Sequence, residues 1–96
     1  MYQIDRMKKD FQKAIGAIRK EMNSQYPKAM MTGQQMRKNT ATVNCGGEHR
    51  SEQYSVELAC QVIDDKRFKE FLTTYNATAE IEKNPFGGFQ IRLHFR

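Results

Sequence analysis

The chain has 96 residues, which is enough for one domain (residues 1–96) but too few for a second hydrophobic core. Hydrophobic residues make up 39% and charged residues 28% of the sequence, a balance that argues against disorder, and no apolar run of about 18 residues could cross a membrane. The formal net charge of +5 favours an acidic partner, and the lack of an apolar secretory signal leads us to expect a cytoplasmic protein.

The first element expected along the chain is an amphipathic helix over about residues 2–25, because apolar residues recur there every three or four positions. Tyr26 and Pro27 should end it, since proline lacks a backbone donor and disfavours helix in the preceding residue. Residues 28–39 have no clean period, and we expect a long, basic, methionine-rich loop. The apolar stripe of the helix consists of Ile4, Met7, Phe11, Ile15, Ile18 and Met22.

A hairpin and a short helix are expected next. Apolar residues alternate over residues 41–45 and again over 54–62, with glycines between the two runs, which predicts two strands joined by a turn. Asp64 or Asp65 should then cap the N-terminus of a short helix. The buried face of that helix would consist of Phe68, Phe71, Leu72 and Tyr75.

A second hairpin completes the chain, with strands over residues 77–81 and 89–95 and a loop over 84–88. The element order is therefore α-β-β-α-β-β. This order predicts an α+β fold in which a four-stranded antiparallel sheet carries two helices packed on one face. The other face of the sheet should remain open to solvent.

The side chains expected on this open face are polar. A register that pairs Ile81 with Ile91 places Glu80 opposite Arg92, and such a pair of opposite charges is an ordinary stabilising contact. RNA-binding sheets usually stack bases on exposed aromatic side chains, and none of the expected exposed strand positions is aromatic. The sequence therefore argues against base stacking on the sheet.

The surplus positive charge lies in the first part of the chain. Residues 1–38 contain nine basic and three acidic residues, a net charge of +6, whereas residues 39–96 contain seven basic and eight acidic residues, a net charge of −1. Four of the basic residues fall within about 60° of one another on the helical wheel, opposite the apolar stripe. These are Arg6, Lys9, Lys13 and Lys20, and we expect Lys28, Arg37 and Lys38 to extend the same surface.

A row of cations along a helix has the form needed to follow a phosphate backbone, so we expect a non-enzymatic module that binds DNA or RNA. Gly16 and Ala17 flank the row and leave a low spot for the partner. Two other interpretations remain open. The cations could contact an acidic protein surface, or they could form an ordinary solvated helix face.

Exposed apolar side chains would favour a protein partner instead. Flexible methionines suit adaptable contact surfaces, and a phenylalanine at a loop tip could anchor a partner. Under this alternative the chain would be a small inhibitor-type protein, mobile-element or phage-like, that binds a nucleic-acid-handling protein complex. The candidate anchors are Met31, Met36 and Phe86.

Cysteine and histidine give weak support for metal binding or catalysis. Cys60 is in phase with the apolar residues of its expected strand and should be in the core, far from Cys45, so neither a disulfide nor a shared metal is expected. A third hypothesis is a small ribonuclease in which His49 or His94 acts as acid or base beside Arg92. We expect no cofactor, because no P-loop or comparable motif is present.

Overall fold

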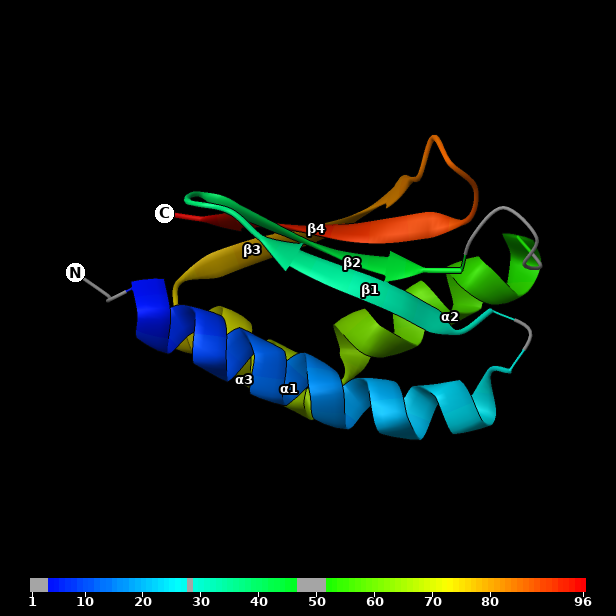
Figure 1. Cartoon of the computed structure of the whole chain (residues 1–96), viewed down its shortest axis with the longest axis horizontal. Coiled ribbons are helices and arrows are strands. Elements are labelled where there is room, and N and C mark those ends of the chain that lie inside the picture. Colours follow the sequence, from blue (N-terminus) through cyan, green and yellow to red (C-terminus); the bar gives the residue numbers. More distant parts are fainter. Residues whose placement is uncertain (1–3, 28, 47–51) are drawn as a thin grey trace.

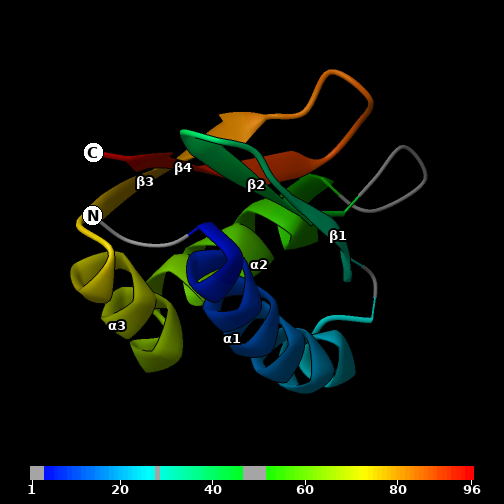
Figure 2. The same cartoon turned by 60° about the vertical axis from the view of Figure 1, so that its left-hand side comes forward.

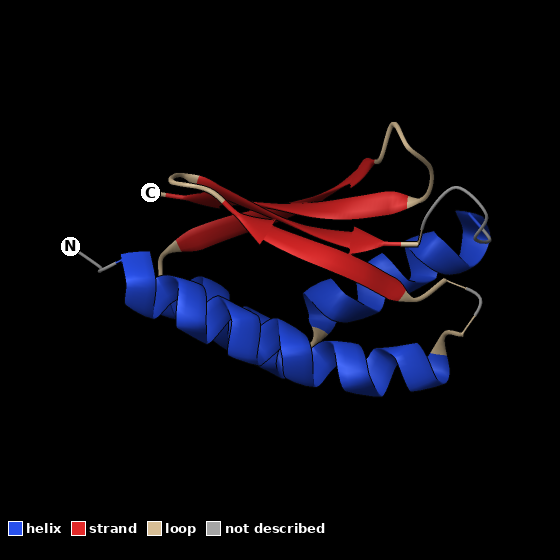
Figure 3. Cartoon of the chain, in the orientation of Figure 1, coloured by secondary structure: helices blue, strands red, loops and turns tan. Residues whose placement is uncertain are grey.

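The structure is a computed structural model that describes residues 4–27, 29–46 and 52–96. Its four strands form one antiparallel sheet in the order β1-β2-β4-β3. The helices all lie on one face of this sheet, and the opposite face is open (Figures 1 and 3). The elements are α1 (Ile4–Gln25), β1 (Met31–Met36), β2 (Thr40–Cys45), α2 (Glu52–Asp64), α3 (Lys66–Thr74), β3 (Ala77–Lys83) and β4 (Phe89–Phe95).

The predicted fold class is confirmed: an α+β arrangement with a four-stranded antiparallel sheet covered by helices on one side. The described residues contain three helices rather than the two expected. Among these residues, no helix has both the length and the apolar character needed to cross a lipid bilayer.

Helix α1 forms where the apolar stripe predicted it. Five of its stripe residues are buried against the sheet, but Ile4 at the first turn is 49% exposed and does not join them. The helix ends at Gln25, and the backbone N–H of Tyr26 still bonds the Met22 carbonyl at 2.8 Å before Pro27 turns the chain. The buried stripe residues are Met7, Phe11, Ile15, Ile18 and Met22.

The prediction of a loop over residues 28–39 is wrong for its central part, which forms the edge strand β1. The register of β1 against β2 shifts between Met31 and Gly33, so a bulge breaks the alternation that would have indicated a strand. Asn23 of α1 fixes the start of the strand: its side-chain oxygen accepts a 2.6 Å bond from the Met31 backbone N–H. A single polar side chain thus sets how α1 meets the sheet.

The predicted strand over residues 54–62 is also wrong, because this segment lies in α2. Small residues occupy helical positions on its inner face, so their burial leaves no trace in a pattern of large apolar residues. Cys60 points to solvent rather than into the core, which corrects its expected burial. The residues that α2 does bury are Ser55, Leu58, Ala59 and Val62.

The close contact between β2 and α2 depends on Gly46, which follows β2. Its φ of +88° is a conformation that residues with side chains rarely adopt. A Cβ atom there would also lie 1.9 Å from the Ser55 hydroxyl of α2. The backbone of Gly46 therefore passes directly against α2 only because it carries no side chain.

The last third of the chain follows the prediction closely. Asp65 caps α3, accepting a 2.8 Å bond from the Arg67 backbone N–H. In the β3–β4 hairpin Ile81 pairs with Ile91, which places Glu80 opposite Arg92 as the sequence predicted, but Arg92 forms its ion pair with Glu82, and Glu80 contacts His94. Aromatic contacts then join α3 to α1 and β4: the ring of Phe71 lies 5.5 Å from Phe11, 4.9 Å from Tyr75 and 6.1 Å from Phe95, measured between centroids.

Candidate functional site

The most prominent charged feature is a row of four exposed cations along α1, which we call the basic ridge: Arg6, Lys9, Lys13 and Lys20. Because α1 buries the opposite side of its surface, the ridge faces away from the sheet. From Arg6 to Lys20 it extends over fourteen helical steps, or about 21 Å at the helical rise. Within the part of the chain that the structure describes, none of the four cations makes an ion pair.

Two of the three acidic residues of α1, Asp10 and Glu21, contact α3, which lies beside α1 (Figure 2), whereas Asp5 is exposed next to Arg6. Glu21 accepts a 2.5 Å bond from the guanidinium of Arg67, and Asp10 accepts a bond from the Tyr75 hydroxyl. Arg67 also donates a hydrogen bond to Asp65. The carboxylates of Asp65 and Glu21 together raise the pKa of Arg67 above its usual value. Pairing across the helices therefore keeps the charge of Glu21 away from the ridge cations.

A gap interrupts the ridge between Lys13 and Lys20, where Gly16 and Ala17 are both exposed. A Cβ atom added at Gly16 would have no other atom within 4 Å, so packing does not require glycine there. The predicted low spot is therefore present on the surface. The helix backbone is thinly covered there, between two cations.

Beside this gap lies a groove of about 300 Å³ between α1 and α3, which sequence reasoning did not find. Small and aromatic residues line part of it: Ala14 and Ala17 from α1, and Phe71 and Tyr75 from α3 and its C-terminal end. The charged residues Asp10, Arg67 and Glu70 line it as well. Lys13 of the ridge stands at its rim. The groove depends on how two helices pack, and a single helical wheel contains no information about that.

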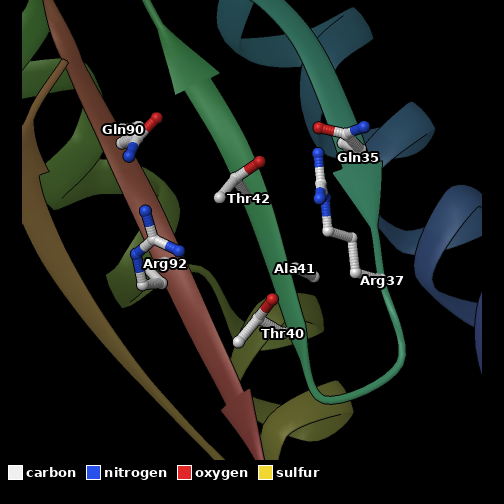
Figure 4. A pocket seen from close by; sticks show the side chains of 7 residues that line it. All are labelled: Gln35, Arg37, Thr40, Ala41, Thr42, Gln90 and Arg92. Carbon is white, nitrogen blue, oxygen red and sulfur yellow. The ribbon is translucent and has the colours of Figure 1, made fainter. Parts of the chain in front are cut away.

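The structure separates the other predicted cations from the ridge. Lys28 lies outside the described residues. Arg37 and Lys38 follow β1 in a tight turn closed by a 2.7 Å bond from the Arg37 N–H to the Thr40 carbonyl. Arg37 shares the open face of the sheet with Arg92, as Figure 4 shows, whereas the ridge lies on the helical side. The expected continuous basic surface is therefore two surfaces on opposite sides of the molecule.

The three candidate apolar anchors differ in their exposure to solvent. Met31 is only 3% exposed, because it starts β1 with its side chain in the core. Met36 is half-buried and packs against the same core. Phe86, by contrast, is 84% exposed at the tip of the β3–β4 hairpin.

The histidine and the cysteines that the structure describes do not gather into a site. His49 lies outside the described residues, and His94 is exposed with its ring Nε2 3.2 Å from Glu80. Cys45 is buried, which raises the pKa of its thiol to about 12, while Cys60 is on the solvent side of α2. In residues 4–27, 29–46 and 52–96, no cluster of three His, Cys, Asp or Glu side chains is placed to hold a metal.

The open face of the sheet carries a polar depression of about 410 Å³, which we call the sheet cup. Two arginines, two glutamines and two threonines line it from β1, β2 and β4. The sequence alone does not indicate it, because the segment that forms its β1 side was expected to be a loop. The lining residues are Gln35, Arg37, Thr40, Ala41, Thr42, Gln90 and Arg92.

Comparisons of the chain with known protein families, with curated proteins and with solved structures find no significant match. The function must therefore be inferred from the surfaces themselves.

Proposed function

We propose that this protein is a small non-enzymatic module that binds nucleic acid through the basic ridge of α1. One observation carries the proposal: all four ridge cations are exposed, lie along one line of a helix, and make no ion pair within the described residues. Unpaired cations keep their full attraction for an external anion. Five buried residues anchor α1 to the core, so the helix backbone that carries these cations is already ordered before a partner binds.

The length of the ridge suits a phosphate backbone. Its extent of about 21 Å spans several phosphates of a duplex, which carries one charge per about 3.4 Å of each strand. Lysine and arginine side chains that contact only phosphates do not distinguish one base sequence from another. We therefore expect binding that tolerates changes of sequence and depends strongly on salt.

Fluorescence anisotropy with a short DNA or RNA duplex tests the proposal. If four phosphates are neutralised, the affinity should fall roughly 100-fold between about 50 and about 200 mM salt. The double variant Lys9→Glu, Lys13→Glu should bind at least about tenfold more weakly at low salt, because it removes two cations and adds two repulsive charges. Both positions are exposed, so the variant should fold.

A matched control is the double variant Lys38→Glu, Arg96→Glu, which makes the same change in net charge away from the helical layer. It should retain most of the affinity. Equal losses in the two double variants would show only a general effect of net charge, and the ridge would then have no specific role.

The groove beside the ridge favours a second candidate, an inhibitor-type protein that docks on an acidic surface of a nucleic-acid-handling complex. Its apolar lining residues offer contacts that a phosphate backbone does not use. The variant Ala17→Arg separates the two candidates, because it fills the groove and adds a cation next to the ridge. Nucleic-acid binding should be preserved or strengthened, whereas docking of a protein in the groove should be lost.

A further inference from the structure

The sheet cup is built by the alignment of three strands. Gln35 of β1 pairs with Thr42 of β2, and Thr42 pairs with Arg92 of β4, so these residues form one row across the sheet. Residues directly opposite each other on neighbouring strands project to the same face. Neighbouring positions on the same strands complete a lining that contains no aromatic side chain.

Arg92 is held in place at one side of the cup. Its Nε donates a 2.7 Å bond to Glu82, which also accepts a 2.5 Å bond from the Gln90 amide. The terminal nitrogens of Arg92 make no hydrogen bond to any described residue. The side chain is therefore oriented by Glu82 while the outer part of its guanidinium can still bind a ligand.

Arg37 approaches from the other side. Arg37 follows β1, which β2 separates from β4, and it lies two residues beyond Gln35, the residue in the same row as Arg92. The side chain of Arg37 extends over the sheet toward Gln35 (Figure 4), and it makes no ion pair within the described ranges. Two guanidinium groups thus face one depression, and with Glu82 counted the local charge is still +1.

We infer that the sheet cup binds a sugar phosphate, with the phosphate held between Arg37 and Arg92. Planar guanidinium groups match phosphate oxygens with paired hydrogen bonds. The glutamine amides and threonine hydroxyls of the lining both donate and accept hydrogen bonds, as the hydroxyls of a sugar require. The absence of an aromatic ring disfavours stacking of a base, and a volume of about 410 Å³ is in the range of small-ligand sites.

This site goes beyond the proposed function, because it lies on the opposite side of the molecule from the basic ridge. A free sugar phosphate and the ribose phosphate of a single-stranded RNA present the same groups to this site. Two probes distinguish these sources: ribose 5-phosphate and hexauridylate. Unphosphorylated ribose serves as the control for the phosphate.

The experiment is a titration of the ¹⁵N-labelled protein, following the backbone amide resonances of Thr42 and Arg92. Ribose 5-phosphate should shift them at millimolar concentration, and ribose should not. Arg37→Gln and Arg92→Gln should each weaken binding at least about tenfold, the usual effect of losing a charged hydrogen-bonding partner. Arg37 makes no ion pair in the described chain, so its variant remains informative even if replacing Arg92 disturbs the sheet.

Arg96→Gln removes the same charge outside the cup and should leave the affinity within about twofold. The ridge variant Lys9→Glu, Lys13→Glu should bind ribose 5-phosphate as the unmodified chain does, so the two proposals can fail independently. Hexauridylate binding that depends on Arg37, without binding of ribose 5-phosphate, would show that the site takes its ribose phosphate from an RNA strand and would still support the site. Equal binding of ribose and ribose 5-phosphate, or affinities unaffected by both arginine substitutions, would overturn the inference.

Discussion

Glu21 of α1 accepts a 2.5 Å hydrogen bond from Arg67 of α3, across the line where the two helices meet. Glu21 lies only one residue after Lys20 and would reduce the positive potential of the ridge if it were unpaired. The contact with Arg67 compensates its charge instead. A structural ion pair between two helices thus also shapes the electrostatics of the proposed interface.

Replacing Glu21 with glutamine tests this relationship. Both partners are substantially exposed, so the free energy of unfolding should fall by less than about 1 kcal/mol. Nucleic-acid affinity at low salt should rise, because the variant removes a negative charge next to Lys20 while Arg67 keeps its ion pair with Asp65. Urea denaturation and anisotropy measure the two quantities, and a weaker affinity in Glu21→Gln would contradict the proposed position of the interface.

The N-cap of α3 should contribute measurably to stability. Asp65→Ala should reduce the free energy of unfolding by about 1 kcal/mol, because the Arg67 backbone N–H loses its acceptor. Asp65→Asn keeps an acceptor and should recover part of that loss. If the two variants were equally unstable in urea denaturation, the ion pair with Arg67 rather than the cap would be the important contact.

The same aspartate should make stability depend on pH. Hydrogen bonds from the Arg67 side chain hold the pKa of Asp65 below its ordinary value of 3.8. A carboxylate with a lowered pKa in the folded state stabilises the fold above its unfolded pKa, and this stability is lost as the pH falls through the folded pKa. Urea midpoints measured at decreasing pH below about 5 should therefore fall more steeply for the unmodified chain than for Asp65→Asn.

The two glycines near the helices should respond in opposite directions to alanine. Gly46→Ala should lower the free energy of unfolding by at least about 2 kcal/mol, because its φ of +88° and the nearby Ser55 hydroxyl leave no room for a Cβ atom. Gly16→Ala should raise it by up to about 1 kcal/mol, since alanine favours a helix and the site is open. Thermal or urea denaturation of both variants measures these changes. A Gly46→Ala variant that is more stable than the unmodified chain would contradict the prediction.

Alkylation distinguishes the observed fold from the strand that the sequence predicted. Cys60 is exposed on α2 and should react with iodoacetamide in the native protein. Cys45 should not react, because it is buried and burial raises the pKa of its thiol to about 12, which keeps it protonated. Peptide mass mapping should find the label on Cys60 alone; protection of Cys60 would place residues 54–62 back in the core of the sheet.

The parts of the fold that could be predicted are those where large apolar residues keep one period. Met7, Phe11 and Ile15 mark α1, and Ile81 and Ile91 set the register of the second hairpin. The basic ridge could be predicted too, because a cation on the outer side of an amphipathic helix needs no tertiary contact to be placed.

The remaining elements could not be predicted, for two physical reasons. In α2, Tyr54, Leu58 and Cys60 alternate like strand residues, whereas the buried helical positions include the small residues Ser55 and Ala59. In β1 a bulge shifts the alternation. Once β1 is missed, the sheet cup cannot be found, because one of its sides comes from that strand.

The bulge in β1 has a consequence for how separate molecules meet. β1 is an edge strand, and an uninterrupted edge offers its backbone donors and acceptors to any passing strand. The register shift between Met31 and Gly33 breaks that row and increases the local twist. The irregularity that hides the strand in the sequence therefore also disfavours the pairing of a neighbouring molecule's strand at the start of β1, whereas β3, the other edge strand, has a regular register.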